Sequence, residues 1–204
     1  MSEMIRVTAF MHPSPYHYRT HEPKRSSLRG GPLKSLADFL DRMHTECPAE
    51  PFSVGPRASK MRFTLPTKLE HATEHSRCLD STSGLQKNGE RFRTAHSQVQ
   101  CFMLEHDAST VAVEIPVWTS ATELQGIPIE IGEQENLSGH IDALSVEAGH
   151  IWIWDYKPRA MRERFAAVQV ALYALMLSTH TGIELSQFRC GYFDTTDCFH
   201  FTPT

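Results

Sequence analysis

The second half of this sequence predicts an α/β fold in which a central sheet is flanked by helices. Two apolar runs with the alternation of strands occupy residues 138–157, and a third covers 110–118. Apolar stripes at helical spacing lie on either side of these runs, over 89–107 and 161–179. Strand and helix patterns therefore follow one another along the chain, as in an α/β domain.

The length limits the number of domains. At 204 residues the chain suffices for one domain with a sizeable core, or for one domain with an appended region. We expect a single catalytic domain with an N-terminal extension. No apolar run is long enough to span a bilayer, and the first ten residues lack the apolar core of a signal peptide. We therefore expect a cytoplasmic protein with no membrane partner.

The net charge of −4 conceals an asymmetry along the chain. Residues 1–93 carry 15 Lys and Arg against 10 Asp and Glu, a balance of +5, whereas residues 94–204 carry 5 against 14, a balance of −9. An acidic segment does not by itself form a nucleic-acid platform, although a metal-binding carboxylate cluster contributes to such a balance. The basic first part is a candidate source of phosphate contacts.

The N-terminal extension, residues 1–88, is expected to be basic, partly helical and partly irregular. Residues 1–35 are rich in Pro, His, Ser and Gly, and we expect a loop or an extended arm there. Apolar residues at helical spacing predict a short helix over 33–43.

The rest of the extension has weaker signals. A second helix is expected over 67–78, followed by a polar link over 80–88. The irregular stretch 47–68 has two readings, a solvated surface or a strip that contacts DNA, and its basic residues are Arg57, Lys60, Arg62 and Lys68.

The catalytic core is expected over residues 89–204 and begins with a helix. An apolar stripe over 89–107 predicts this helix, and His96 lies at the edge of the stripe. The strand over 110–118 carries Glu114 in an otherwise apolar run, and the run 127–131 is a candidate to pair with it.

The stretch 138–157 reads SGHIDALSVEAGHIWIWDYK and concentrates charge in an apolar hairpin. From residue 151 onward alternate side chains share a face, so Asp155 and Lys157 emerge side by side. A hairpin that turns at Gly149 brings Asp142 of the preceding run close to Asp155. Two carboxylates that meet in this way repel each other, and Mg²⁺ or Mn²⁺ suits an oxygen-rich site of this kind better than zinc.

A helix is predicted after Pro158, over 161–179, from its apolar stripe. Gln169 and Tyr173 are four residues apart and share one side of this helix, which faces the carboxylates in our interpretation. Arg159 and Arg162 either contact phosphate or are solvated. Alternating runs over 187–194 and 198–202 predict a closing hairpin.

Each core element thus carries polar candidates in a fixed order, namely His96, Glu114, Asp142, Asp155 with Lys157, and Gln169 with Tyr173. This order resembles the PD-(D/E)XK nuclease superfamily and, within it, the RecB-like exonuclease branch. The resemblance covers about residues 89–178 and rests on GHID, WDYK and the Gln-x-x-x-Tyr helix. It implies a restriction-endonuclease-like core, with a central mixed sheet flanked by helices.

The resemblance also implies a reaction, metal-assisted hydrolysis of phosphodiester bonds in DNA, with one or two Mg²⁺ or Mn²⁺ ions. The implied catalytic residues are Asp142, Asp155, Lys157, Glu114, Gln169 and Tyr173. The implied metal ligands are His96, Glu114, Asp142, Asp155 and the carbonyl of Tyr156. The implied enzyme is an exonuclease in repair, recombination, phage or defence functions, acting on single strands or duplex ends.

Two features depart from the family pattern. Several members carry a four-cysteine iron–sulfur cluster, but Cys190 and Cys198 lack the spacing and the partners for one, and we expect none. The five scattered cysteines instead suit reduced thiols. The helicase regions of RecB are absent, so a helicase or recombination partner would be another chain. Relatives that form rings raise the alternative of a homo-oligomer.

Every candidate also has a purely structural reading. Asp155 and Lys157 make an ion pair at a strand end in that reading, Glu114 faces an edge, and Gln169 and Tyr173 are packing residues. His96 is then a boundary residue, with His106 and His140 as competitors. For the whole protein the alternative is a nuclease-fold module that binds nucleic acid or a protein partner without cutting. Buried like charges argue against that alternative, because a module freed from catalysis has no need of them.

Overall fold

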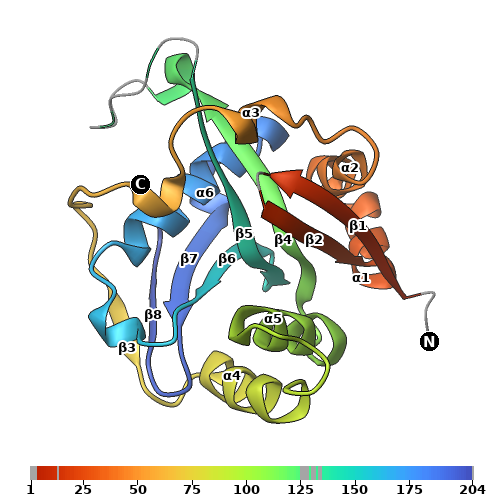
Figure 1. Cartoon of the computed structure of the whole chain (residues 1–204), viewed down its shortest axis with the longest axis vertical. Coiled ribbons are helices and arrows are strands. Elements are labelled where there is room, and N and C mark those ends of the chain that lie inside the picture. Colours follow the sequence, from red (N-terminus) through yellow and green to blue (C-terminus); the bar gives the residue numbers. More distant parts are fainter. Residues whose placement is uncertain (1–3, 13, 125–128, 130–131, 133–134, 204) are drawn as a thin grey trace.

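The computed structural model describes residues 4–12, 14–124, 129, 132 and 135–203. Their strands form an eight-stranded sheet in the order β1-β2-β4-β5-β6-β7-β8-β3, with helices on both faces (Figure 1). Neighbouring strands are antiparallel except for the parallel pair β6 and β7. The predicted α/β class with a mixed sheet is therefore confirmed.

The strands are β1 (Ile5–His12), β2 (Ser14–His21), β3 (Glu70–Ala72), β4 (Thr110–Ser120), β5 (Asn136–Glu147), β6 (His150–Tyr156), β7 (Phe188–Phe193) and β8 (Cys198–Phe201). The helices are α1 (Glu22–Ser27), α2 (Lys34–Met43), α3 (Glu50–Ser53), α4 (Ser76–Lys87), α5 (Ala95–His106) and α6 (Ala166–Thr181). Short 3-10 turns occur at Leu28–Gly30, Ala58–Lys60, Ala121–Leu124, Ala160–Arg162 and Leu185–Gln187.

The predicted central hairpin is β5–β6. Its two turn residues, Ala148 and Gly149, have φ values of 48° and 79°, the positive values that two-residue hairpin turns of type I′ require. The predicted strand over 110–118 is β4, which pairs with β5 on its other side. The closing hairpin is β7–β8, and β7 joins the sheet parallel to β6 after the chain crosses over through α6.

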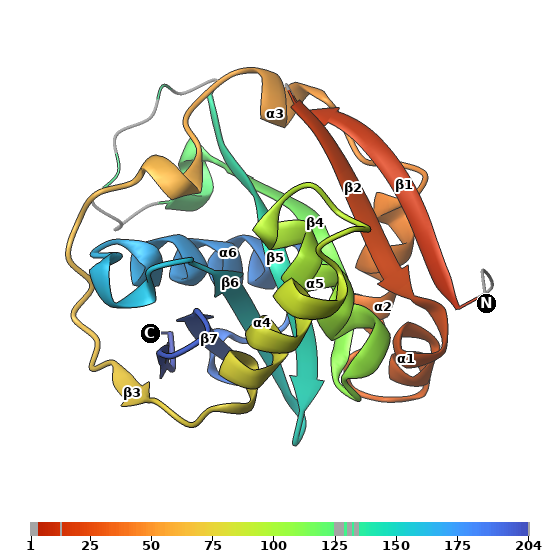
Figure 2. The same ribbon diagram turned by 60° about the horizontal axis from the view of Figure 1, so that its bottom comes forward.

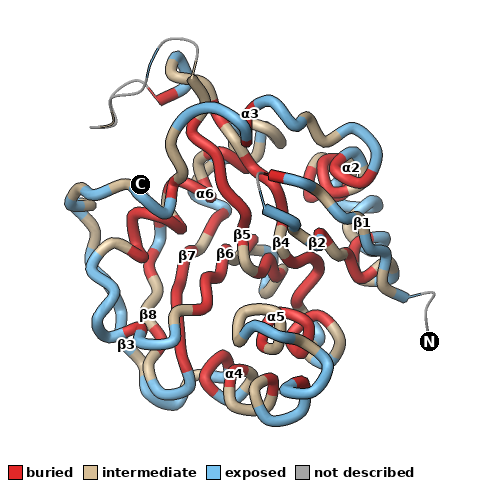
Figure 3. The backbone as a smooth tube through the Cα atoms, in the orientation of Figure 1, coloured by how far each residue is buried: buried red, intermediate tan, exposed pale blue. Residues whose placement is uncertain are grey.

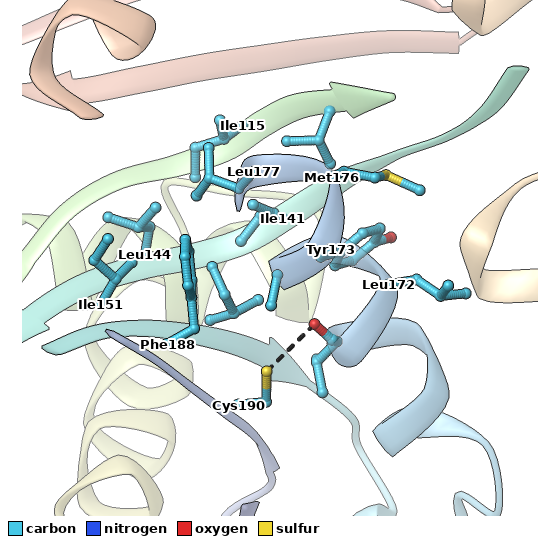
Figure 4. Packing of buried hydrophobic residues seen from close by; sticks show 14 of the residues in the cluster. Ile115, Ile141, Leu144, Ile151, Leu172, Tyr173, Met176, Leu177, Phe188 and Cys190 are labelled. Carbon is cyan, nitrogen blue, oxygen red and sulfur yellow. Dashed lines mark hydrogen bonds between the residues drawn. The ribbon is translucent and has the colours of Figure 1, made fainter. Parts of the chain in front are cut away.

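Helix α6 packs against one face of the sheet together with α2. Figure 4 shows apolar side chains of α6 against those of the strands. Their shared core contains Ile115, Ile141, Leu144, Ile151, Leu172, Met176, Leu177 and Phe188. The prediction placed the start of this helix at residue 161, which is wrong. Residues Ala160–Arg162 form a 3-10 turn, and α6 runs from Ala166 to the left-handed Gly182 that caps it.

Helices α4 and α5 lie side by side on the opposite face (Figure 2). A second apolar cluster lies beneath them and includes Val99, Met103, Trp154 and Phe193. Helix α5 begins six residues later than the predicted start at residue 89, because the Thr94 hydroxyl accepts a hydrogen bond from the Ser97 amide and caps the helix.

The expectation of a loop or arm over residues 1–35 is wrong. Strands β1 and β2 form a hairpin that extends the sheet beyond β4. Tyr18 of β2 is fully buried, and its hydroxyl donates to the Leu40 carbonyl of α2 at 2.8 Å. The hairpin therefore covers a core to which the predicted helix α2 also contributes.

The helix expected over 67–78 and the polar link over 80–88 are also wrong. Strand β3 pairs with β8 at the far edge of the sheet, and α4 spans Ser76–Lys87. The polar character of α4 has a structural cause, since its buried Arg77 forms ion pairs with Asp80, Asp107 and Glu147. This arginine ties α4 to Asp107, which precedes β4, and to Glu147 at the end of β5. Along the backbone of α4, buried positions alternate with more exposed ones (Figure 3).

Segments on both sides of residue 88 thus contribute to one sheet, with β1, β2 and β3 forming its two edges (Figure 1). The boundary at residue 88 remains a prediction about where the catalytic core begins. The expected strand over 127–131 lies outside the described residues, apart from Ile129. Among the helices described, none has the length and apolar character needed to cross a membrane.

Candidate active site

Three adjacent strands each contribute a carboxylate to one cavity of about 370 Å³. They are Glu114 on β4, Asp142 on β5 and Asp155 on β6, and Lys157 follows directly after β6. The remaining lining residues are Tyr16, Arg57, Ser59, Thr94, His96, Gly139, His140, Gln169 and Tyr173. The sheet therefore gathers the acidic residues, while helices and the N-terminal segment complete the walls.

Glu114 occupies an unusual backbone conformation for a strand. Its φ is 55°, in the left-handed region that a residue with a side chain rarely adopts, and the β4–β5 pairs on either side of it hold it there. Its Oε1 accepts a hydrogen bond from Gln100 Nε2 at 2.9 Å. Burial raises the pKa of Glu114 to about 6, although Gln100 and Arg19 oppose the rise.

Asp142 and Asp155 lie in the most acidic part of the cavity. The Tyr156 amide donates to Asp142 Oδ2 at 3.0 Å and fixes that carboxyl group. Burial raises the pKa of both aspartates to about 7, and each rise is increased by a neighbouring carboxylate, Glu114 for Asp142 and Asp142 for Asp155. Close to neutral pH, a bound proton or cation would therefore stabilise this pair of carboxylates by relieving their repulsion.

Gln169 connects the lysine to the aspartate. Lys157 Nζ donates to Gln169 Oε1 at 3.0 Å, and Gln169 Nε2 donates to Asp155 Oδ1 at 3.1 Å. Burial lowers the pKa of Lys157, but Asp155 and Asp142 outweigh that effect and leave the pKa raised. Lys157 is therefore a protonated amine with a fixed orientation.

Tyr173 supports Gln169 from the next turn of α6. Gln169 Nε2 lies 3.1 Å from the Tyr173 hydroxyl, and the tyrosine ring packs on Gly139 of β5. A Cβ atom at Gly139 would lie 2.4 Å from Tyr173 Cε1, so the glycine is required for this contact. The glycine of the GHID sequence thus makes room for the tyrosine of the Gln-x-x-x-Tyr sequence.

One carboxylate oxygen of Asp155 is buried beside the amine of Lys157. Asp155 is 1% exposed, and its Oδ2 is buried without a hydrogen-bond partner among the described residues. Lys157 Nζ lies only 2.7 Å from this oxygen, which makes an ion pair, but the approach lacks hydrogen-bond geometry. The ion pair compensates the charge of this oxygen, and the oxygen can still accept a further ligand.

His96, in the first turn of α5, lies at the border of the same cavity. Its Nε2 is 3.8 Å from Asp142 Oδ2, and its ring meets the Tyr156 ring edge to face at 5.3 Å. The pKa of His96 is lowered, chiefly by burial, although Asp155 and the Tyr156 backbone oppose this shift. The competitor His106 lines a different cavity, beside Glu105.

The structure therefore brings every predicted catalytic residue and His96 into one cavity. Tyr156, whose carbonyl is a predicted metal ligand, does not line this cavity, although its amide donates to Asp142 Oδ2. A comparison with protein families gives a match to the PD-(D/E)XK nuclease superfamily over residues 58–201. The chain belongs to the PD-(D/E)XK nuclease superfamily. A comparison with curated proteins gives no match.

The superfamily match begins at residue 58, earlier than the predicted core. It includes strand β3 and helix α4, both of which the sequence patterns assigned to an extension. PD-(D/E)XK nucleases typically use Mg²⁺ or Mn²⁺, and this property raises the question of whether the present residues suit such an ion.

The carboxylate oxygens of the cavity have the chemistry and the negative charge that a hard divalent cation prefers. Three carboxylates with raised pKa values and the buried Oδ2 of Asp155 are the oxygen ligands such ions prefer. Within the described part of the chain, however, no three His, Cys, Asp or Glu side chains form a ready-made ligand set. Binding would therefore require side chains to adjust, among them Lys157, which now pairs with Asp155 Oδ2.

Sequence patterns missed the contribution of the N-terminal segment. Tyr16 of β2 stacks on His140, with ring centroids 3.7 Å apart, and His140 Nε2 lies 3.1 Å from His12 Nδ1. Burial lowers the pKa of His140 to about 2, so this histidine is a neutral packing residue of the cavity wall. The sequence indicated only that this part of the chain is basic and rich in Pro, His, Ser and Gly.

The arginines after β6 have separate positions. Arg162 lines a neighbouring cavity of about 270 Å³, which shares Ser59, Lys157 and Gln169 with the first one. Arg159 lines neither of these cavities. A phosphate contact thus remains a prediction for Arg162, and the position of Arg159 gives it no support.

Proposed function

We propose that this chain is a metal-dependent deoxyribonuclease of the RecB-like branch, and an exonuclease rather than an endonuclease. The main support is the hydrogen-bonded series Lys157, Gln169 and Asp155 in a cavity with two more carboxylates. A purely structural ion pair has no need of acids whose pKa values reach about 7, since their mutual repulsion destabilises the fold.

In this proposal Asp142, Asp155, Glu114 and His96 hold one or two Mg²⁺ or Mn²⁺ ions, and the Tyr156 carbonyl adds a ligand. When bound, such ions polarise the phosphate and lower the pKa of a coordinated water. The carboxylates thereby become compatible with an anionic substrate, because bound cations reverse the local charge.

The other side chains act on the substrate and the water. Lys157, as a protonated amine, orients the attacking water and stabilises the charge that develops on the phosphate. Gln169 keeps the amine of Lys157 directed into the cavity, since it accepts one hydrogen bond from it and donates another to Asp155. Tyr173 restricts the rotation of Gln169.

The proposed substrate is DNA, as single strands or duplex ends, in repair, recombination, phage or defence functions. A helicase or recombination protein would then supply any motor as a separate chain. We also propose that the protein self-associates, because some members of the branch that it resembles form rings.

The test incubates the protein with labelled linear and circular DNA in Mg²⁺, in Mn²⁺ and in EDTA. We expect linear DNA to be degraded from its ends when the metal is present, and circular DNA to persist. Asp155→Ala and Lys157→Ala should each abolish cutting while still folding, as judged by circular dichroism. If neither DNA nor RNA is degraded, or if both variants cut like the parent, the nuclease proposal is wrong and the non-cleaving binding module is favoured.

A further inference from the structure

Arg57 is a cation in the catalytic cavity that comes from outside the sheet and makes no ion pair with the described carboxylates. Arg57 and Lys157 are the Lys and Arg side chains in its lining. Lys157 is already engaged, by Gln169 Oε1 at 3.0 Å and by the Asp155 carboxylate at 2.7 Å. The positive charge of Arg57 is therefore the one still available to an anion.

The backbone around Arg57 is fixed to the sheet. Arg57 bridges to Ser138 of β5, and the Ser138 amide donates to the Pro56 carbonyl at 3.2 Å. Gly55 precedes this bridge with a φ of 96°, and a Cβ atom there would lie 2.4 Å from the Asn136 carbonyl oxygen. The loop is thus positioned by β5, the same strand that carries Asp142.

The guanidinium group is also oriented by neutral partners. Its Nη2 donates to the His12 carbonyl at 2.6 Å, and its Cζ lies 5.8 Å from the centre of the Phe52 ring. Neither contact neutralises the charge, and both restrict the side chain, which lowers the entropy lost when a ligand binds. A planar cation with free N–H groups suits a phosphate oxygen.

The position along β5 explains why Arg57 does not pair with the aspartate. Ser138 precedes Asp142 by four residues, which correspond to about 13 Å of extended strand. An arginine side chain covers only part of that distance. Arg57 therefore lines the same cavity as the acidic residues without forming an ion pair with them.

We propose that Arg57 binds a phosphate of the nucleic-acid strand in the catalytic cavity. This inference rests on the proposed nuclease function and adds a substrate contact from the N-terminal segment. The opposing interpretation is that Arg57 only ties the end of the β1–β2 hairpin to the loop through the His12 carbonyl. The two interpretations differ in salt dependence and in catalysis.

The experiment compares Arg57→Gln and Arg57→Lys with the parent and with a matched control, Arg189→Gln. Arg189 also donates to main-chain carbonyls, of Ser186 and Phe188, but lies on β7 outside the cavity. Affinity for a single-stranded oligonucleotide is measured in Ca²⁺ at several salt concentrations, kcat/KM is measured in Mg²⁺, and the melting temperature of each variant is recorded.

Arg57→Gln should weaken binding about 10- to 100-fold, as expected for loss of a charged hydrogen bond. The slope of log affinity against log salt should fall by about one contact, or about 0.7 for single strands. Arg57→Lys should retain most of the slope because it keeps the charge, and Arg189→Gln should match the parent in both measurements.

If Arg57→Gln keeps the parental slope and kcat/KM, the proposal is overturned, whether or not its melting temperature falls. A parent that binds DNA without cutting would refute the nuclease function, while the slope comparison would still decide the role of Arg57. A parent that neither binds nor cuts nucleic acid would refute both.

Discussion

At the scale of single residues, the buried carboxylates that the proposed chemistry requires are not the side chains that would stabilise the fold most. Burial raises the pKa values of Asp142 and Asp155 to about 7. Asp155 Oδ2 is also buried without a hydrogen bond from the described residues. An amide in either position would remove a repelling charge while keeping the shape of the side chain. The carboxylates therefore destabilise the metal-free protein, and this effect is measurable.

Asp142→Asn should stabilise the metal-free protein at pH 8. The folded-state pKa of Asp142 is raised to about 7, so its stabilising contribution is present below the unfolded pKa and is lost as the pH rises through 7. We expect the variant to gain about 1–3 kcal/mol over the parent at pH 8 in EDTA, and the gap to narrow towards pH 4. Urea unfolding at both pH values measures the difference.

The matched control is Asp38→Asn, which removes a more exposed carboxyl that pairs with Lys34. Its effect should be small at either pH, because solvent screens an exposed ion pair. A loss of stability in Asp142→Asn at pH 8 would show that the carboxylate is compensated in the metal-free fold, contrary to our interpretation.

Sequence reasoning placed most of these side chains because the relevant spacings are local. Asp155 and Lys157 share a face through the period of two, and the Lys157 amide continues the pairing by donating to Phe193. Gln169 and Tyr173 share a side of α6 through the helical period. Arg57 and Tyr16 had no such signal, because their place in the cavity depends on contacts with β5 and with His140, which are distant in sequence.

At the scale of elements, the close contact between β5 and α6 sets the position of Gln169. The Tyr173 ring fills the space above Gly139, and Tyr173 in turn lies within hydrogen-bond distance of Gln169. Any displacement of α6 from β5 is therefore transmitted to Lys157 and Asp155.

Gly139→Ala should destabilise the protein by about 1–3 kcal/mol, because the new methyl group overlaps the Tyr173 ring. Nuclease activity per folded molecule should fall as well. In a Tyr173→Ala background the same substitution should cost much less, so the two changes are not additive. Gly30→Ala is the control, since a Cβ atom there meets nothing within 4 Å. Additive costs for Gly139→Ala and Tyr173→Ala would contradict this account.

The β1–β2 hairpin is held to the rest of the fold by a buried histidine. The Thr20 hydroxyl donates to Glu22 and so accepts from His44 Nε2 at 2.8 Å, which leaves His44 Nδ1 as the acceptor for Thr8 at 2.7 Å. This arrangement requires the neutral ring. Burial accordingly lowers the pKa of His44 to about 4.

The hairpin should therefore loosen in acid. Since the folded-state pKa of His44 is depressed from 6.5 to about 4, its contribution is complete above pH 6.5 and is lost as the pH falls through 4. Hydrogen exchange of β1 and β2, corrected for intrinsic rates, should be faster at pH 4.5 than at pH 7.5. His44→Gln should remove most of this pH dependence, and an unchanged dependence in that variant would assign it to other groups.

The hairpin also shows why element prediction failed before residue 36. Burial along β1 does not follow a simple alternation, and β2 carries Pro, His and Tyr in place of aliphatic residues. Tyr18 is buried because α2 and β4 lie beneath it, which is a tertiary cause that no local pattern records. Strands β4, β5 and β6, by contrast, are apolar on the faces that the sheet buries, and the sequence predicted each of them.

At the scale of the whole molecule, metal binding and global stability should be coupled. The carboxylates come from three adjacent strands of the central sheet, so relief of their repulsion stabilises the sheet as a unit. Under the proposed function, the acidic balance of residues 94–204 would reflect, in part, a site that bound cations complete.

Mg²⁺ or Mn²⁺ at about 100 times its dissociation constant should add about 2.7 kcal/mol and raise the melting temperature by about 5–10 °C. The shift should be larger at pH 8 than at pH 5.5, because protons compete for Asp142 and Asp155 below their pKa of about 7. Asp155→Asn should lose most of the shift. A shift of equal size in that variant, measured by differential scanning fluorimetry, would place the ion elsewhere.

The edges of the sheet have a consequence for the order of events during synthesis. Residues of β2 find their partners on β4 only when Val113 has been made, and β3 pairs with β8 at residues 198–200. At ribosomal rates, these intervals last on the order of 5–25 s, during which the early strands have no sheet to join. Tyr16 and Arg57 belong to the part of the chain that is made first, whereas the three carboxylates are synthesised later. Ser138, to which Arg57 bridges, is also made before Asp142 and Asp155. The cavity wall that carries Arg57 can therefore form before the last carboxylate of the acidic centre has been synthesised.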